Sequence, residues 1–203
     1  GYHHWGTDVV SHLHGMFAFV IAERDTGRVV LARDRLGIKP LYLADMTGGL
    51  RFASSVPALL EAGGVDTGID PDGLHHYLSL HAIVPAPATL LRGVRKLPPA
   101  TLLTIEPDGR RHEERYWRLD YARSAADESR SFEAWREILL AALRTSVRRQ
   151  LMSDVPVGAL LSGGVDSSLI VGLMAEQGVR DLRTYNVGFE DVAGFTGLLQ
   201  AAA

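Results

Sequence analysis

A stretch rich in glycine and serine contains the residue types in this sequence that are best suited to bind a charged ligand. It consists of Ser162, Gly163, Gly164, Val165, Asp166, Ser167 and Ser168. Glycines permit positive φ and leave main-chain N–H groups uncovered, and the free N–H groups at the start of a helix attract anions. The serine hydroxyls add neutral donors, so the stretch predicts a polyphosphate site. A carboxylate repels phosphates unless a cation intervenes, and we therefore interpret Asp166 as a Mg²⁺ ligand.

The residues on either side predict the elements that would position this stretch. Residues 155–161 are apolar at nearly every position, which is typical of a buried parallel strand. A helix is expected over about 166–177 and a second strand over 184–188, in the strand–loop–helix–strand order of a βαβ unit. Apolar residues at helical spacing over 132–151 predict an amphipathic helix before this unit, with its apolar stripe in the core.

The spacing does not match the Walker A loop, because the pattern G-x-x-x-x-G-K-[ST] is absent and no lysine lies in the turn. The order Ser-Gly-Gly-x-Asp-Ser-Ser instead resembles the phosphate loop of the ATP-pyrophosphatases. That resemblance implies cleavage of ATP between its α and β phosphates, which leaves an adenylated substrate and pyrophosphate. The alternative is a helix-capping turn without a ligand, and seven matched positions disfavour it.

The first 120 residues predict a mainly β domain. Short apolar runs separated by tight turns occur at 17–22, 29–32, 40–43 and 50–54. They predict four consecutive strands of one antiparallel sheet. Helices are expected at 56–64 and from Asp70 to about residue 80, and a second hairpin at 102–117. A polar segment follows at 121–131 and is expected to be a linker.

Motifs in the first half of the chain narrow the choice of family. They lie at 14–19, 32–42, 52–55, 84–99 and 115–117. In this order they resemble the glutamine-hydrolysing asparagine synthetases. The resemblance implies that a cysteine releases ammonia from glutamine, and that ammonia passes through a tunnel to an adenylated carboxylate. Segments 81–87 and 99–110 resemble one branch more closely, the N-acetylglutaminylglutamine amidotransferases.

This resemblance implies an α/β protein in two parts. Residues 1–120 would be the C-terminal part of a class II, Ntn-type glutamine amidotransferase domain, built on an antiparallel β-sheet. Residues 121–131 would be the linker. Residues 132–203 would begin the ATP-pyrophosphatase domain, a parallel-sheet domain of the adenine-nucleotide α-hydrolase-like type.

The resemblance also implies roles for individual residues, with ATP and Mg²⁺ as cofactors. Leu161 would contact ATP, and Val187 would lie beside the adenine or ribose. The pyrophosphate end would be held by Ser162, Gly163, Gly164, Asp166, Ser167 and Ser168, with Asp166 on Mg²⁺. Four residues of the first half are expected to hold the sheet and the domain contact instead of performing chemistry: Arg33, Asp34, Gly37 and Lys39.

Two departures from the family pattern shape the expectation for this polypeptide. The sequence contains no cysteine, and the resemblance places the nucleophilic cysteine before Gly1, so no catalytic residue is expected here. The stretch 191–203 does not resemble the family. A frameshift or a fragmentary sequence would explain this difference. We therefore expect the polypeptide as given to be inactive in glutaminase and ATP–pyrophosphate exchange assays.

The composition argues against a nucleic-acid-binding protein and against a membrane-spanning protein. The 203 residues are 46% hydrophobic with a net charge of −3, which leaves no cationic excess for nucleic acid. No apolar run reaches the roughly 18 residues that span a bilayer. A cytoplasmic location is expected, with no nucleic-acid or membrane partner. The expected substrates are glutamine and a small carboxylate, aspartate or an acetylated dipeptide, and a homodimer is one expected assembly.

Two alternatives stay open beside this interpretation. Other pyrophosphatase-loop enzymes, such as GMP synthetase, NAD synthetase, argininosuccinate synthetase and the tRNA-thiolating enzymes, lack a first half with the motifs at 14–55. A non-catalytic ATP-binding remnant is the second alternative, and a nucleotide titration would separate it from an active enzyme.

Overall fold

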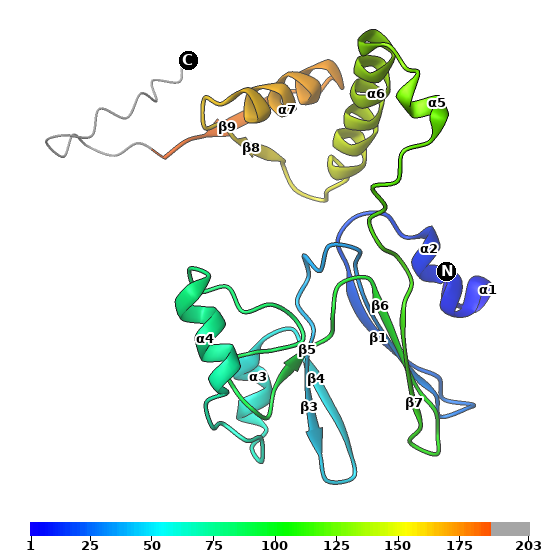
Figure 1. Ribbon diagram of the computed structural model, residues 1–203, viewed down its shortest axis with the longest axis vertical. Helices are drawn as coiled ribbons and strands as arrows, with labels where there is room; N and C mark the ends of the chain where they lie inside the picture. The colour runs from blue at the N-terminus through cyan, green and yellow to red at the C-terminus, as the bar shows by residue number, and fades with distance from the viewer. Residues whose placement is uncertain (188–203) are drawn as a thin grey trace, which may run out of the picture. The chain divides into compact units, whose positions relative to one another are not determined.

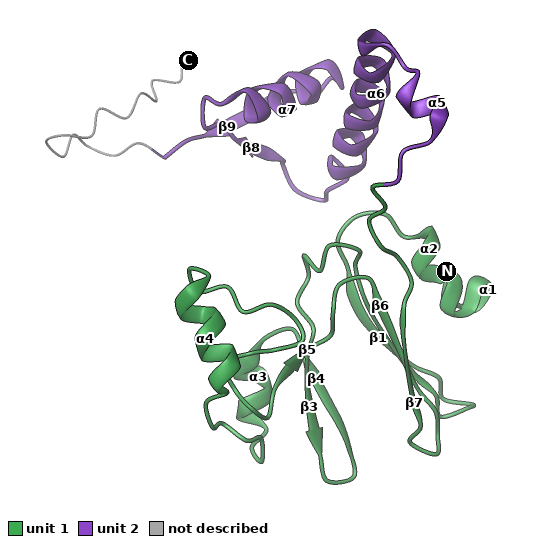
Figure 2. Ribbon diagram, viewed as in Figure 1, with its two compact units in different colours: residues 1–121 green, residues 122–203 purple. Residues whose placement is uncertain are grey.

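The computed structural model describes residues 1–187. The chain divides into two compact units, residues 1–121 and 122–203 (Figure 2). Among the helices of the described residues, none is both long enough and apolar enough to cross a membrane.

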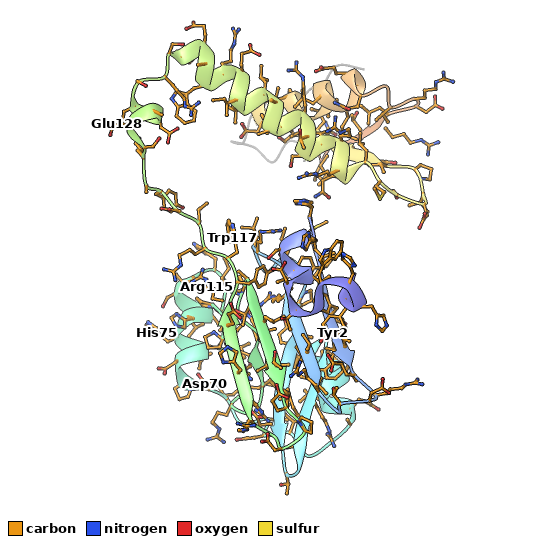
Figure 3. All side chains as sticks on the ribbon, turned by 90° about the vertical axis from the view of Figure 1, so that its right-hand side faces the viewer. Tyr2, Asp70, His75, Arg115, Trp117 and Glu128 are labelled. Carbon is orange, nitrogen blue, oxygen red and sulfur yellow. The ribbon has the colours of Figure 1, made fainter. Side chains whose placement is uncertain are left out.

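Unit 1 contains two short N-terminal α-helices with a 3-10 helix between them, seven strands and two further α-helices (Figure 1). In chain order they are α1 (Tyr2–Trp5), the 3-10 helix η1 (Gly6–Asp8), α2 (Val9–His12), β1 (Ala18–Ala22), β2 (Val29–Arg33), β3 (Tyr42–Met46), β4 (Gly49–Ala53), α3 (Val56–Glu61), α4 (Pro71–Ser79), β5 (Arg95–Lys96), β6 (Thr101–Ile105) and β7 (Arg111–Arg115). The expected hairpins β1–β2 and β6–β7 and both expected helices are confirmed. Helix α4 begins where Asp70 accepts a hydrogen bond from the Gly73 N–H at 2.6 Å (Figure 3).

The prediction of one sheet from four consecutive strands is wrong. Strands β1 and β2 belong to a four-stranded antiparallel sheet of order β1-β2-β6-β7, and β3 and β4 belong to a second sheet of order β4-β3-β5. The far edge of β2 is taken by β6, with Leu31 opposite Leu103. No edge of β2 is therefore left for β3. This pairing joins residues about 70 positions apart, which local turn signals do not reveal.

The two sheets pack face to face between two helical layers. The buried leucines of the inner core come from both sheets: Leu31, Leu41, Leu43, Leu97 and Leu103. On the outer face of the first sheet, α2 contributes Val9 and Val10. On the outer face of the second sheet, α3 contributes Leu59. The alternation of β2, where Leu31 faces inward and Val30 and Ala32 face the helices, follows from the two-residue period of a strand. The expected α/β class, with antiparallel sheets in the first part of the chain, is confirmed.

Unit 2 contains α5 (Ala125–Glu128), α6 (Phe132–Gln150), β8 (Gly158–Leu160), α7 (Val165–Glu176) and β9 (Arg183–Tyr185). Helix α5 lies in the segment expected to be a linker. Helices α6 and α7 share a core around Val147, Leu173 and Met174.

The burial expected in unit 2 is only partly present. Ala159 of β8 packs on the α6–α7 core, but Leu160 is 78% exposed. The sheet of the described residues has two strands, and its helices cover one face, so alternate side chains of β8 stay open. Similarly, α6 packs through its C-terminal half, while Phe132 is 75% exposed. The interpretation of the whole α6 stripe as core is therefore wrong.

We expect Tyr116 to make unit 1 sensitive to alkali. Its hydroxyl donates to the Arg33 carbonyl at 2.7 Å, and burial raises its pKa to about 12. The folded state favours the protonated form, so its contribution is complete below pH of about 10, the usual value, and is lost as the pH rises towards 12. Urea unfolding at pH 8 to 12 should show Tyr116→Phe less stable by about 1 kcal/mol at pH 8. Its stability should then fall less steeply than that of the wild type above pH 10. Equal slopes would contradict the assignment. The pH dependence of stability of Tyr2→Phe is compared with that of Tyr116→Phe, because burial also raises the pKa of Tyr2 to about 12.

Candidate functional site

Parallel pairing of β8 and β9 positions the predicted phosphate loop. Gly158, Ala159 and Leu160 lie opposite Arg183, Thr184 and Tyr185. The register continues one residue further, where the Leu161 N–H donates to the Tyr185 carbonyl at 2.8 Å. Ser162 and Val187 therefore each come two residues after the last paired residues, Leu160 and Tyr185. The carboxyl ends of parallel strands are where ligands bind in α/β sheets. The structure thus brings the predicted loop and Val187 to the same sheet edge, where Val187 is 68% exposed.

Close packing of β9 explains the glycine before the loop. A Cβ atom on Gly158 would lie 2.7 Å from the Tyr185 ring and 3.0 Å from the Arg183 carbonyl oxygen. Cβ atoms essentially never come as close as 2.7 Å to another heavy atom, so a larger residue at position 158 would displace the Tyr185 ring and crowd the β9 backbone. The sequence interpretation did not single out this glycine, although a glycine inside a strand is a known signal of close backbone approach.

The two glycines of the loop have different roles. Gly163 has a φ of 81°, which glycine adopts without the penalty of a side chain. Gly164 is the N-cap of α7, with φ −77° and ψ 161°, which any residue can adopt. Positive φ is therefore needed at Gly163 only. No side chain of the described residues caps the α7 N-terminus, so its first N–H groups stay available to a ligand.

The three serines of the loop are hydrogen-bonded within it. Ser162 Oγ lies 3.1 Å from Ser167 Oγ. The hydroxyls of Ser167 and Ser168 both donate to the Gly164 carbonyl, at 3.1 and 2.9 Å. A hydroxyl must leave such a bond before it can donate to a phosphate, so the uncapped N–H groups are the donors that are ready without rearrangement.

Asp166 is the carboxylate of this loop. It is exposed in the first turn of α7, and none of the hydrogen bonds or ion pairs found among the described residues involves its side chain. No group of three or more histidine, cysteine, aspartate or glutamate side chains gathers as a metal site within residues 1–187. One free carboxylate suits Mg²⁺ held jointly with phosphates and water, because Mg²⁺ in nucleotide sites commonly uses one or two carboxylates. The residues present therefore fit a Mg²⁺–polyphosphate.

The motif around Arg33 and Asp34 forms a buried junction in unit 1. Asp34 is 1% exposed and accepts main-chain N–H bonds from Leu36, Ile38 and Lys39 at 3.2, 3.0 and 2.9 Å. The Arg33 guanidinium donates to the carbonyls of Lys39, Gly37 and Leu97 at 2.8, 2.6 and 2.6 Å. Burial lowers the pKa of the Arg33 guanidinium. Its three partners are carbonyl oxygens, which do not take up a proton from it. These contacts support the interpretation that the motif holds the sheets and performs no chemistry.

Two further residues belong to this junction: Gly37, which was expected from the sequence to hold the sheet, and Lys96, which was not singled out. Gly37 has a φ of 66°, and a Cβ atom there would lie 2.8 Å from Pro99 Cγ. Lys96 makes two hydrogen bonds to the loop that contains Val84 and Pro87. Its Nζ donates to the Val84 carbonyl at 2.5 Å, and its main-chain N–H donates to the Pro87 carbonyl at 2.8 Å. Burial, and then the charge of Arg33, lower the pKa of Lys96.

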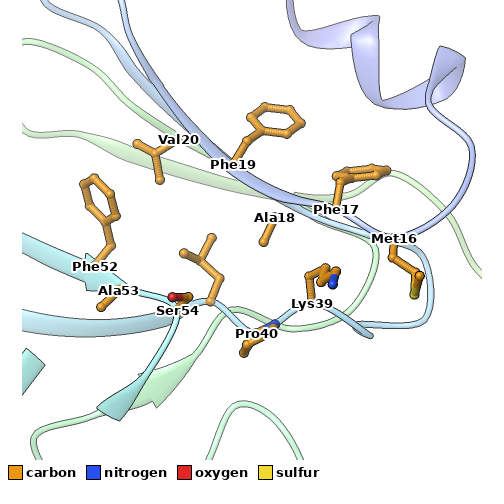
Figure 4. Close-up of a pocket in the computed structure, with 11 residues that line it drawn as sticks. Met16, Phe17, Ala18, Phe19, Val20, Lys39, Pro40, Phe52, Ala53 and Ser54 are labelled. Atoms are coloured by element: carbon orange, nitrogen blue, oxygen red, sulfur yellow. The ribbon is translucent and has the colours of Figure 1, made fainter. Parts of the chain in front are cut away.

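A cavity of about 560 Å³ lies in unit 1, between its two sheets. Figure 4 shows Met16–Val20 along one side and Phe52–Ser54 along the other. Lys39 is the charged residue of its lining. Ser54 supplies a hydroxyl to the same lining, and no hydrogen bond found among the described residues joins it to the Lys39 amine. Among the described residues, those of the loop at 162–168 are the ones suited to bind a charged ligand.

Comparisons with known proteins match both units. A glutamine amidotransferase domain family matches residues 1–117, and an asparagine synthase family matches residues 139–202. A Mycobacterium tuberculosis protein named as a glutamine-hydrolysing asparagine synthetase is 42% identical over 194 residues, which are 94% of this chain and 29% of that protein. Asparagine synthetase 1 of Bacillus subtilis is 38% identical over 189 residues, 93% of this chain and 29% of that protein.

A relative with a different name matches over a similar length. The amidase chry2 of Gibberella zeae is 31% identical over 206 residues, which cover 95% of this chain and 30% of that protein. The chain thus spans less than a third of the length of each of these relatives.

Proposed function

Since this chain belongs to the glutamine-hydrolysing asparagine synthetase family, we propose that it is part of an enzyme that adenylates a carboxylate with ATP. Ammonia released from glutamine would then displace AMP and form an amide. Adenylation is chemically useful because a carboxylate is a poor electrophile and AMP is a far better leaving group than oxide. A cytoplasmic location is part of this proposal.

The observation that carries the proposal is the loop between β8 and α7. Its uncapped N–H groups follow the loop that leaves β8 at its carboxyl end, and Asp166 is exposed in the first turn of α7. Anions bind at helix N-termini through such N–H groups and the helix dipole. The loop contains no lysine, so the charge of the phosphates would be met by the Mg²⁺ that Asp166 holds.

Each residue of the loop has a part in this function. Gly163 turns the chain, and the N–H groups that follow Gly164 bind the pyrophosphate end. Ser162, Ser167 and Ser168 supply hydroxyls to the same phosphates. Leu161 and Val187, at the carboxyl ends of the paired strands, lie beside the adenosine. Mg²⁺, when bound, neutralises phosphate charge and so favours departure of pyrophosphate.

The acceptor is a small carboxylate, with aspartate as the first candidate. The family name and the names of the bacterial relatives support aspartate. The segments 81–87 and 99–110 favour an acetylated dipeptide instead. A homodimer of the full-length enzyme is also proposed. Incubating the full-length enzyme with each acceptor, ATP and glutamine, and identifying the amide by mass spectrometry, would decide between the two acceptors.

A titration of this chain tests the nucleotide site. ATP is titrated into the folded chain with Mg²⁺ by calorimetry, and inorganic pyrophosphate is then used as competitor. We expect Mg-ATP to bind and pyrophosphate to displace it. A folded chain that binds neither ligand at millimolar concentration would refute the proposal. Exchange of labelled pyrophosphate into ATP, measured on the full-length enzyme with the acceptor carboxylate present, separates two outcomes: binding with exchange supports adenylation, and binding without exchange supports an ATP-binding remnant.

A further inference from the structure

Strand β1 has no strand partner along one of its two edges within the described residues. The hydrogen bonds to β2 show which of its groups lie at that edge. The Glu23 N–H donates to the Arg28 carbonyl at 2.8 Å, and the Asp34 N–H donates to the Phe17 carbonyl at 2.8 Å. Both contacts continue the register of the β1–β2 pairing. Hydrogen-bonded pairs of an antiparallel ladder recur at every second residue, so the odd-numbered residues of β1 bond to β2.

The even-numbered residues of β1 therefore direct their main-chain groups away from β2. They are Ala18, Val20 and Ala22, and each has one N–H and one carbonyl. No hydrogen bond found within residues 1–187 uses these outward groups. Such a row of unpaired groups is a template for a further strand.

The two outer edges of this sheet differ in their side chains. Strand β7, at the other edge, is exposed throughout and charged at Arg111, Glu113, Glu114 and Arg115. Arg111 also forms an ion pair with Asp45 of the second sheet. Strand β1 has the sequence Ala-Phe-Val-Ile-Ala, without a charge or a proline. Charged residues and prolines keep an exposed edge from pairing with another chain, so the edge of β7 is protected and that of β1 is not.

Pairing of each edge with its own copy can be compared by the residues that it would oppose. Around a two-fold axis at Glu113, two β7 strands would place Glu113 opposite the partner's Glu113, with arginine opposite arginine at either end. Like charges directly opposite each other are destabilising. Around a two-fold axis at Val20, two β1 strands place Val20 opposite the partner's Val20 and Ala18 opposite the partner's Ala22, and no charges are opposed. Of these two edges, that of β1 is the one suited to self-pairing.

We propose that β1 binds β1 of a second copy of this chain, in an antiparallel pairing centred on Val20. In this register outward-pointing residues lie opposite outward-pointing residues, so each of the three opposite pairs exchanges two main-chain hydrogen bonds. The two four-stranded sheets then form one continuous sheet across a two-fold axis, which is a closed, isologous contact. This surface lies in unit 1, and its pairing does not depend on a nucleotide at the loop of 162–168, so the inference and the proposed function can fail separately.

The test measures self-association of the full 203-residue chain and of variants at Ala22. Sedimentation velocity between micromolar and millimolar concentration gives the dissociation constant of the dimer, and amide hydrogen exchange is measured at residues 18, 20 and 22. We expect a monomer–dimer equilibrium in which these amides exchange more slowly as the concentration rises. Ala22→Pro removes an outward N–H without breaking a bond to β2. Because the dimer then loses two hydrogen bonds between its copies, its dissociation constant should rise about 25-fold.

A second variant keeps the test decisive if Ala22→Pro does not fold. Ala22→Lys retains the N–H and places a charge at the same edge, which should also weaken the dimer. Position 22 is used because it is the exposed end of β1, whereas Ala18 and Val20 pack against the inner core.

Glu113→Pro is the matched control at the edge of β7. The Tyr116 N–H donates to the Ala100 carbonyl at 2.9 Å and continues the β6–β7 register, so by the same two-residue rule the Glu113 N–H points away from β6. The variant thus removes an outward N–H of the same kind, and it should leave the dissociation constant of the dimer unchanged.

Three results would overturn the proposal. A chain that stays monomeric at millimolar concentration while residues 18, 20 and 22 exchange freely would show that the edge does not pair. A monomer in which these amides exchange slowly would show that another part of the same chain covers the edge. A dimer that Ala22→Pro and Glu113→Pro weaken equally would place the contact elsewhere.

Discussion

Asp34→Ala is expected to lower the free energy of unfolding of unit 1 by about 3–5 kcal/mol, one of the largest effects of any single substitution in this chain. The carboxylate is 1% exposed and satisfies the N–H groups of Leu36, Ile38 and Lys39. Alanine leaves these donors without their acceptor, and each unsatisfied group costs about 1–3 kcal/mol where water does not replace the carboxylate. Urea unfolding followed by circular dichroism measures the loss.

Two further variants make this result specific. Asp34→Asn keeps one carbonyl oxygen and should therefore be less damaging than alanine. Asp25→Ala removes an exposed carboxylate from the β1–β2 turn and should change stability by less than about 0.5 kcal/mol. If Asp34→Ala and Asp25→Ala lose equally little, the turn at 34–39 does not depend on the buried carboxylate.

Asp166→Asn is expected to raise the dissociation constant of Mg-ATP at least about tenfold, which corresponds to about 1.4 kcal/mol. The free carboxylate in the first turn of α7 is the proposed Mg²⁺ ligand, and a neutral amide oxygen is a weaker ligand for a hard cation. Without Mg²⁺ the same variant should bind ATP as well as the wild type or more tightly, because it removes a negative charge beside the phosphates. Calorimetric titrations with Mg²⁺ and with EDTA measure both effects.

The substitution should have opposite effects on ATP binding with and without Mg²⁺, and this difference identifies Asp166 as the Mg²⁺ ligand. A variant that only distorts the loop would weaken ATP binding equally with and without Mg²⁺, and that result would reject the assignment. Asp181→Asn removes the same charge from the turn before β9. Because β8 and β9 are parallel, this turn lies at the sheet edge opposite the loop, and the control should leave both dissociation constants unchanged.

Local signals in the sequence were sufficient for most elements and for the site motif. The apolar run before Ser162, the glycines and the apolar helix after Asp166 predict a strand, a turn and a helix, and the structure has them in that order. The signals for the helix that begins after Asp70 and for the second hairpin were equally local, and both elements are present. Such features depend on residues within a few positions of each other, so the sequence specifies them directly.

Pairing between distant residues could not be derived in the same way. Whether β2 pairs with β3 or with β6 depends on the burial of Leu31 against Leu103, and their order along the chain contains no signal for it. The burial of Asp34 and the clash that excludes a side chain at Gly37 also arise only when Pro99 and Leu97 are brought back to the turn. These contacts form after the chain closes long loops, which is a property of the whole fold.

The phosphate loop shows both contributions in one place. The sequence by itself determined that residues 162–168 form a glycine and serine turn with one carboxylate, because residue type sets backbone freedom and hydrogen-bonding capacity. Only the tertiary structure decided that positive φ is needed at Gly163 and not at Gly164, and that two serine hydroxyls share one carbonyl. The reason is geometric: the pairing of β8 with β9 sets where the loop begins, the packing of α7 on α6 sets where it ends, and the backbone between these ends has to satisfy both.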